Sequence, residues 1–244
     1  MKKIILLFTI GLISIFTFGQ GSSKPIGDYA VLVTSDRDGE LDCSGGSIYS
    51  QSPLNSTQYL SSDEGGIQVM FENFSGLSDN IAGLSFWGIL REVGPGTDCY
   101  SPGPQDFEIK FYQDNAGEIG TLVQTFSITV TPSETGSFLG IYSLLRYDVT
   151  LPSSFSLATG WFSVVKLNPG ASPCRFSWAN TTTGDNNVGW STNGGTYIYG
   201  PINLSFCLTT SLAAPPVPIS NWALGIGLLL ISGFIIIRFR RRLA

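Results

Sequence analysis

The chain has 244 residues, of which 43% are hydrophobic and only 13% are charged, and it contains no histidine. The missing histidine excludes histidine-based catalytic triads and histidine metal sites, and the formal net charge of −5 disfavours nucleic acid as a partner. The aromatic share of 12% together with the low charge argues against a disordered chain.

The first twenty residues have the layout of a secretory signal peptide. Lys2 and Lys3 precede an uncharged apolar run from Ile4 to Phe18, and small or polar residues follow. We therefore predict a signal peptide over residues 1–20, cleaved near Gly19–Gln20, and an exported mature chain. An uncleaved N-terminal membrane anchor is the alternative.

Residues 24–210 are predicted to form one all-β ectodomain. Short runs rich in β-branched and aromatic residues are separated by Gly, Pro, Asn, Asp and Ser, and no helical stripe interrupts them. The predicted strands are Ala30–Ser35, Gly66–Phe74, Ala82–Leu90, Phe107–Tyr112, Thr121–Val130, Ile141–Val149, Trp161–Leu167, Cys174–Ala179, Val188–Ser191, Thr196–Tyr199 and Leu204–Leu208. Their spacing favours an antiparallel β-sandwich or jelly roll.

An acidic segment near the start of this ectodomain is a candidate calcium site. Asp36, Asp38, Glu40 and Asp42 place four carboxylates at alternate positions around a glycine, and Ca²⁺ takes six to eight oxygen ligands. The spacing is not that of an EF-hand loop. A solvated acidic loop is the alternative.

Four cysteines, Cys43, Cys99, Cys174 and Cys207, predict two disulfides in an exported chain. Four cysteines allow three connectivities. We favour Cys43–Cys99, because both cysteines lie in loop-like segments, and Cys174–Cys207, because these two flank the last predicted strands.

The aromatic residues divide into candidates for the core and candidates for a ligand surface. Trp87 and Trp161 lie inside apolar runs and are predicted to be buried. Trp178, Trp190 and Tyr197 lie in or near the polar segment Asn180–Gly195, and we predict that they stack on sugar rings, with core packing as the alternative.

The stretch Phe107–Thr121, FEIKFYQDNAGEIGT, predicts a strand, a turn at Asp114–Gly117 and a second strand. With Leu84–Gly88 before it, and with YDVTLPSSFSL and Gly160–Phe162 after it, this stretch resembles secreted bacterial β-sandwich modules. The resemblance implies a surface module and supplies no catalytic residues.

The C-terminal end combines a Pro-rich linker, Ser211–Pro218, with an apolar run over residues 222–237 and an arginine cluster. The run predicts a transmembrane helix with its arginines in the cytoplasm. Residues 217–244 resemble the bacterial PEP-CTERM type of sorting signal, although the strict Pro-Glu-Pro form is absent. The residues that carry this resemblance are Val217, Pro218, Ser220, Trp222, Arg238, Arg240, Arg241 and Arg242.

The resemblance of the tail implies recognition by an exosortase-type membrane protease and cleavage near Pro218–Ser220. The protein would then pass from the inner membrane to the cell surface or the extracellular matrix. A plain single-span membrane anchor is the alternative.

These features favour a non-enzymatic surface or matrix protein with an adhesive or binding role. A carbohydrate-binding module is the alternative, and a carboxylate-based glycoside hydrolase is less favoured because 18 scattered acidic residues single out no pair. Without the signal peptide and tail, seven basic residues face 18 acidic ones, a net charge of −11 (7 − 18). Such a charge disfavours anionic polymers as ligands.

Overall fold

The computed structural model describes residues 27–29, 32–33, 41–43, 45–54, 56–64, 68–92, 94, 96–99, 103–167, 174–192 and 195–210. Within these ranges all regular structure is β-strand, so the predicted all-β class is confirmed. The predicted signal peptide, linker, transmembrane helix and sorting signal lie outside the described ranges. No helix suited to crossing a membrane occurs among the residues that were described.

The larger of two sheets has ten strands, and all its strand pairs are antiparallel. Its strands are β1 (Gly27–Tyr29), β2 (Leu32–Val33), β3 (Ser47–Gln51), β4 (Gln58–Ser61), β6 (Ile81–Glu92), β9 (Ser133–Leu139), β10 (Tyr142–Phe155), β12 (Cys174–Thr181), β15 (Asn203–Leu204) and β16 (Phe206–Thr209). The main path runs β1-β4-β12-β6-β10-β9-β2, while β15 pairs with β12 and β16 pairs with both β3 and β6.

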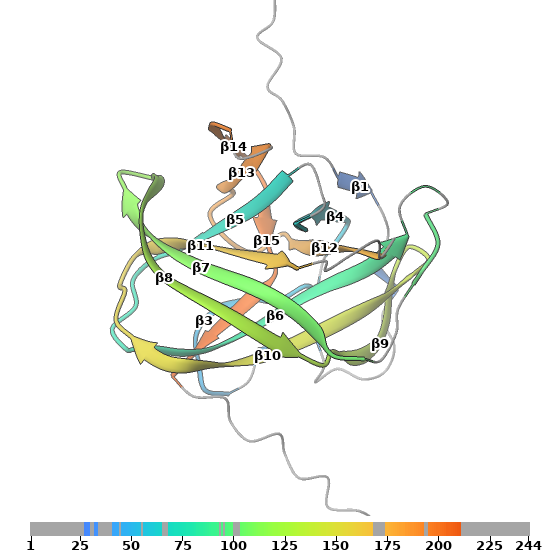
Figure 1. Ribbon diagram of the computed structural model, residues 1–244, viewed down its shortest axis with the longest axis horizontal. Coiled ribbons are helices and arrows are strands. Elements are labelled where there is room, and N and C mark those ends of the chain that lie inside the picture. Colours follow the sequence, from blue (N-terminus) through green and yellow to red (C-terminus); the bar gives the residue numbers. More distant parts are fainter. Residues whose placement is uncertain are drawn as a thin grey trace, which may run out of the picture.

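The smaller sheet has six antiparallel strands in the order β14-β13-β5-β11-β7-β8. Its strands are β5 (Gln68–Phe74), β7 (Gln105–Asn115), β8 (Glu118–Val130), β11 (Gly160–Lys166), β13 (Val188–Thr192) and β14 (Tyr197–Gly200). Figure 1 shows the long β7–β8 hairpin lying across β6 and β10 of the larger sheet. The described chain therefore has a sandwich-like arrangement of two layers.

An aromatic core fills the space between the two sheets. Side chains alternate along each strand, so Phe86 and Trp178 of the larger sheet meet Phe107 and Phe162 of the smaller one, with ring centroids 5.3 Å apart for Phe86–Phe107 and 5.4 Å apart for Phe162–Trp178. Full burial of each large apolar side chain stabilises the fold by roughly 1.5–3 kcal/mol. These rings therefore hold the layers together.

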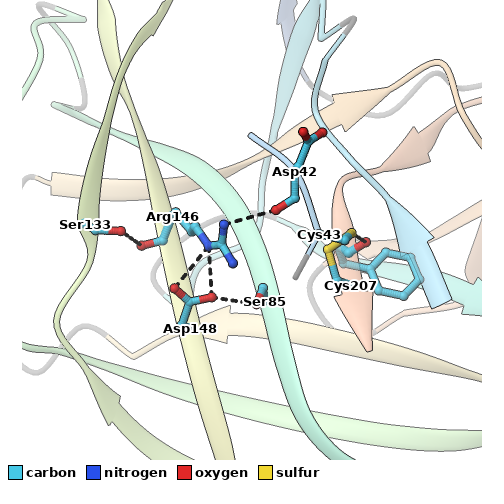
Figure 2. Close-up of polar contacts among 8 residues, drawn as sticks. Asp42, Cys43, Ser85, Ser133, Arg146, Asp148 and Cys207 are labelled. Atoms are coloured by element: carbon cyan, nitrogen blue, oxygen red, sulfur yellow. Dashed lines mark hydrogen bonds and ion pairs between the residues drawn. A yellow bond between two sulfur atoms is a disulfide. The ribbon is translucent and has the colours of Figure 1, made fainter. Parts of the chain in front are cut away.

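A second apolar cluster covers the opposite face of the larger sheet. Trp87, which is fully buried as predicted, packs there with Leu41 and beneath the Arg146 guanidinium, 5.4 Å from the indole centroid. Arg146 also donates to Asp148 at 2.9 Å and to the backbone oxygen of Asp42 at 3.1 Å, as Figure 2 shows. These contacts fasten the segment that leads into β3 onto the outside of β10.

The predicted number of disulfides is confirmed, but the favoured pairing is wrong. The bonds join Cys43 to Cys207, with Cα atoms 5.7 Å apart, and Cys99 to Cys174, with Cα atoms 6.0 Å apart. Both separations suit a disulfide. The pairing is set by the positions of the strands in the sheets, and not by the order of the cysteines along the chain.

The first bond forms because the segment before β3 packs Leu41 and Cys43 into the outer cluster that contains Cys207 of β16, the strand paired with β3. The second bond forms at the end of β6. Cys174 lies opposite Glu92 there, and the returning chain places Asp98 against Arg91, next to Cys99. Each cysteine therefore meets the partner that sheet topology brings to it.

Candidate functional site

The outer face of the smaller sheet carries a cluster of aromatic side chains. Antiparallel partners point to the same face of a sheet. The register places Tyr112 opposite Trp161 and Phe71 opposite Gly189. Gly189 in turn lies opposite Tyr199. Tyr197 lies opposite Ser191 on the same face. We call Phe71, Tyr112, Trp161, Tyr197 and Tyr199 the aromatic face.

Edge-to-face contacts order the rings of the aromatic face. The centroid of Phe71 lies 5.6 Å from Tyr112 and 5.1 Å from Tyr197, and Trp161 lies 5.5 Å from Tyr199. Phe71 and Trp161 are buried, whereas Tyr197 is 38% exposed and Tyr112 and Tyr199 are half-buried. The buried rings thus form a rigid base beneath tyrosines that solvent reaches.

The tip of the β7–β8 hairpin bends over one end of this face. The Ile119 amide donates to the Tyr199 hydroxyl at 2.9 Å, and the Trp161 indole donates to Asp114 at 3.1 Å. A Cβ on Gly189 would lie 2.9 Å from Ile119 Cδ1, so a larger residue there would have to displace the end of the Ile119 side chain. Asn115 pairs with Glu118, and the two residues between them, Ala116 and Gly117, have positive φ. The turn therefore lies within Asp114–Gly117, as predicted.

The hydroxyls of the half-buried tyrosines stay protonated at neutral pH. Burial raises the pKa of Tyr112 to about 12, opposed by a hydrogen bond with Ser163. Burial likewise raises the pKa of Tyr199, opposed by the bond from the Ile119 amide. A phenol in this state can donate a hydrogen bond to a hydroxyl or ether oxygen of a ligand.

A cleft of about 520 Å³ lies further along β7 and β8, away from the hairpin tip. Its lining residues are Glu64, Asp106, Phe107, Ser127, Ile128, Thr129 and Leu167. Asp106 and Thr129 are cross-strand partners, and the Thr129 hydroxyl donates to Asp106 Oδ1 at 2.6 Å. The cleft therefore offers carboxylates and hydroxyls next to apolar walls.

The cleft and the aromatic face share one side of the sheet. Asp106 and Tyr112 are six residues apart on β7, so their side chains point the same way, separated by about 20 Å at about 3.3 Å per residue. Leu122, which lies opposite Tyr112, is 53% exposed and extends the apolar surface. A ligand that touches both ends must be elongated.

The structure separates the three predicted stacking residues. Trp178 is fully buried, and its indole donates to the Ser205 carbonyl at 2.8 Å. Trp190 is only 2% exposed and belongs to the same core. Neither indole is accessible to a sugar ring in this fold, which corrects the prediction for both. Tyr197 alone lies on an accessible face.

The polar segment Asn180–Gly195 contributes mainly to the structure. Asn180 Oδ1 accepts hydrogen bonds from the backbone of Thr57 at 2.8 Å and of Gln58 at 2.9 Å. Asn203 Oδ1 accepts one from the Asn186 amide at 2.8 Å, and Val188–Thr192 is strand β13. Its polar side chains therefore stabilise the edge of the sandwich.

The predicted calcium site falls mostly outside the described residues. Asp36, Asp38 and Glu40 lie there, whereas the exposed Asp42 carboxylate points away from Arg146 in Figure 2. Among the residues that the structure describes, no group of three or more acidic or cysteine side chains is placed to hold a metal ion. The calcium site stays a prediction.

Sequence reasoning did not single out Tyr112 and Leu122 as surface residues, or Phe71 as the buried ring beneath the aromatic face. Each lies in an apolar run that is typical of a core strand. A signal was present in FEIKFY, because alternation that turns Phe107, Ile109 and Phe111 inward must turn Tyr112 outward. The contribution of Phe71 depends on its register against β11, which the local sequence does not reveal.

Comparisons of the chain with models of protein families, with curated proteins and with solved structures give no significant match.

Proposed function

We propose that this chain is an exported, non-enzymatic module of the cell surface or extracellular matrix that binds a polysaccharide through the aromatic face and the adjoining cleft. The observation that carries the proposal is the solvent-accessible group of tyrosines, which buried rings support and which lies on the same side of the sheet as the cleft. Flat aromatic rings with polar edges suit the apolar faces and hydroxyls of sugars.

The chemistry of the surface limits the class of polysaccharide. The ectodomain charge of −11 (7 − 18) opposes a polyanionic ligand. Glu108 and Lys110, which lie between the cleft and Tyr112, form an ion pair with each other. We therefore favour a polysaccharide that is uncharged or carries amino groups. The length of the site favours contact with several consecutive sugar units inside the polysaccharide chain.

Export is supported by the two ends of the sequence and by the disulfides. The predicted signal peptide and the PEP-CTERM-like tail lie at opposite ends of the sequence, and the two disulfides are typical of an oxidising compartment. A protease of the exosortase type would act on the tail, after which the module would reside outside the inner membrane.

The intact mass of the protein recovered from its native envelope or medium tests the sorting part of this proposal. We expect a mass that lacks about residues 1–20 and everything after about residue 218. A mass that retains residues 222–244 would instead identify a membrane-tethered protein.

Replacing Tyr197 with alanine tests the ligand surface. We expect the full chain to be retained on cellulose, chitin or chitosan, but not on polygalacturonate. Tyr197→Ala should lose at least tenfold in affinity, as for an exposed aromatic anchor worth about 1.4 kcal/mol or more. The measurement is binding to each polymer by depletion from solution.

The matched control is Phe138→Ala. Phe138 is 44% exposed but lies on β9 of the other sheet, so its loss removes a similar ring from elsewhere. Retention on none of cellulose, chitin and chitosan, or equal losses in the two variants, would refute the proposed surface.

A further inference from the structure

A glutamate that has no oppositely charged partner among the described residues lies between the two sheets. Glu72 is at the centre of the smaller sheet, on β5, and its neighbours across the sheet are Phe162 and Val188. All three side chains are completely buried. A carboxylate in such apolar surroundings is costly unless it is paired or neutral.

The hydrogen bonds of Glu72 are incomplete on one oxygen. Glu72 Oε2 accepts the Leu204 amide of the opposite sheet at 2.7 Å, whereas Oε1 has no hydrogen-bond partner among the described residues. Gln51, which ends β3 and is 1% exposed, lies beside the Glu72 carboxyl, and its side-chain amide lowers the pKa of that carboxyl, as a hydrogen-bond donor does. The Gln51 Nε2 atom donates to the Tyr49 hydroxyl at 3.2 Å, and Gln51 Oε1 also lacks a described partner.

Glu72 Oε1 is therefore a buried acceptor without a donor among the described residues. A carboxyl that keeps its proton carries no charge into these apolar surroundings, whereas an ionised one would bury an unpaired charge.

The charged and titratable groups around Glu72 do not compensate a negative charge. Tyr49 faces it from β3 and Asp185 faces it from the turn between β12 and β13, while β11, β13 and β15 present Phe162, Val188 and Leu204. Burial, and secondarily the Asp185 carboxylate, raise the pKa of Glu72 well above its ordinary value, opposed by hydrogen bonds from the Leu204 amide, the Gln51 side chain and the Asn73 backbone.

We propose that the buried Glu72 is protonated in the folded protein, that its neutral carboxyl joins β5 of the smaller sheet to the Leu204 amide of the larger sheet, and that ionisation of this acid destabilises the fold. The buried acid is a pH-sensitive link inside the fold, distinct from the ligand surface.

The direction of the pH effect follows from the two states of the chain. In the unfolded chain Glu72 ionises near its usual pKa of about 4.3, whereas in the folded protein it stays neutral. The link therefore contributes fully below about pH 4.3, and its contribution is lost progressively as the pH rises toward the folded pKa.

Urea unfolding of the full chain at pH values from about 4 to 8, for the natural protein, for Glu72→Gln and for Glu134→Gln, tests the link. We expect the unfolding equilibrium constant of the natural protein, relative to that of Glu72→Gln, to rise by up to about tenfold per pH unit above pH 4.3. Glu134 is exposed on β9, so its variant should follow the natural protein.

A constant ratio between the natural protein and Glu72→Gln across this range would overturn the proposal. Infrared difference spectra of the two proteins supply a second readout. A protonated carboxylic C=O band at pH 7, present in the natural protein and lost in Glu72→Gln, supports the proposal. A carboxylate band at that pH, or stability that rises with added monovalent or divalent cation and only in the natural protein, contradicts it.

Discussion

Replacing Cys43 and Cys207 together with alanine is expected to lower the free energy of unfolding by about 5 kcal/mol, the value that the loop-entropy model gives for a loop of this length. The two cysteines are 164 residues apart, so their bond joins the start of the described ectodomain to its last strand. Without it, the unfolded chain gains the conformational freedom of nearly the whole domain. Urea unfolding under non-reducing conditions measures the loss.

The Cys99→Ala, Cys174→Ala double variant is the matched control. Its cysteines are only 75 residues apart, so the same model gives a smaller loss, about 4.5 kcal/mol. Peptide mapping of the unreduced natural protein must also recover Cys43 joined to Cys207. Recovery of Cys43 joined to Cys99, or an unchanged unfolding midpoint in the first variant, would contradict the observed connectivity.

Gly88→Ala is expected to destabilise the protein by about 3 kcal/mol, at the upper end of the usual cost of overpacking a core. A Cβ on Gly88 would lie 2.3 Å from the Phe176 ring and 2.6 Å from the Ser177 carbonyl oxygen of the neighbouring strand β12. The ring has little room to move, because Phe86, Phe107 and Tyr147 all contact it. Thermal or urea unfolding measures the effect.

Gly45→Ala provides the control for this substitution. A Cβ at Gly45 meets no atom within 4 Å, so we expect a change within about 0.5 kcal/mol. Equal unfolding midpoints for the two variants would show that β6 and β12 are not packed as described.

Local sequence patterns predict the strands and the hairpin well. The β7–β8 hairpin is an example, since alternating residues flank a turn whose Asp114 and Gly117 have the required chemistry. The buried states of Trp87 and Trp161 also follow from their apolar neighbours. In contrast, β9 has the sequence SETGSFL, which contains no apolar run, and it forms because β10 pairs with it across a tight turn.

Features that depend on long-range register are not predictable in this way. The disulfide pairing requires knowing that β16 lies between β3 and β6. The burial of Trp178 depends on its position opposite Gly88 and on the Ser205 carbonyl that accepts its indole proton. Its polar neighbours in sequence suggest exposure. In the structure, however, they form hydrogen bonds at a sheet edge and do not form a solvated loop.

The candidate site combines both kinds of information. Tyr197 is identifiable from sequence because it follows a polar segment and begins an edge strand. The cleft is not, since Glu64, Asp106 and Leu167 come from three separated parts of the chain. They meet because the Glu64 amide donates to the Lys166 carbonyl and the Leu167 amide donates to the Asp106 carbonyl.

Hydroxyl-radical footprinting of the full chain, with and without the polysaccharide that retains it, tests the proposed ligand surface most directly. We expect the ligand to protect Tyr197 and Leu122 from oxidation, while Phe138 and Ile141, which are 44% and 69% exposed on the β9–β10 hairpin of the other sheet, oxidise at an unchanged rate. Protection of Phe138 and Ile141 with no change at Tyr197 and Leu122 would place the ligand elsewhere and contradict a binding role for the aromatic face.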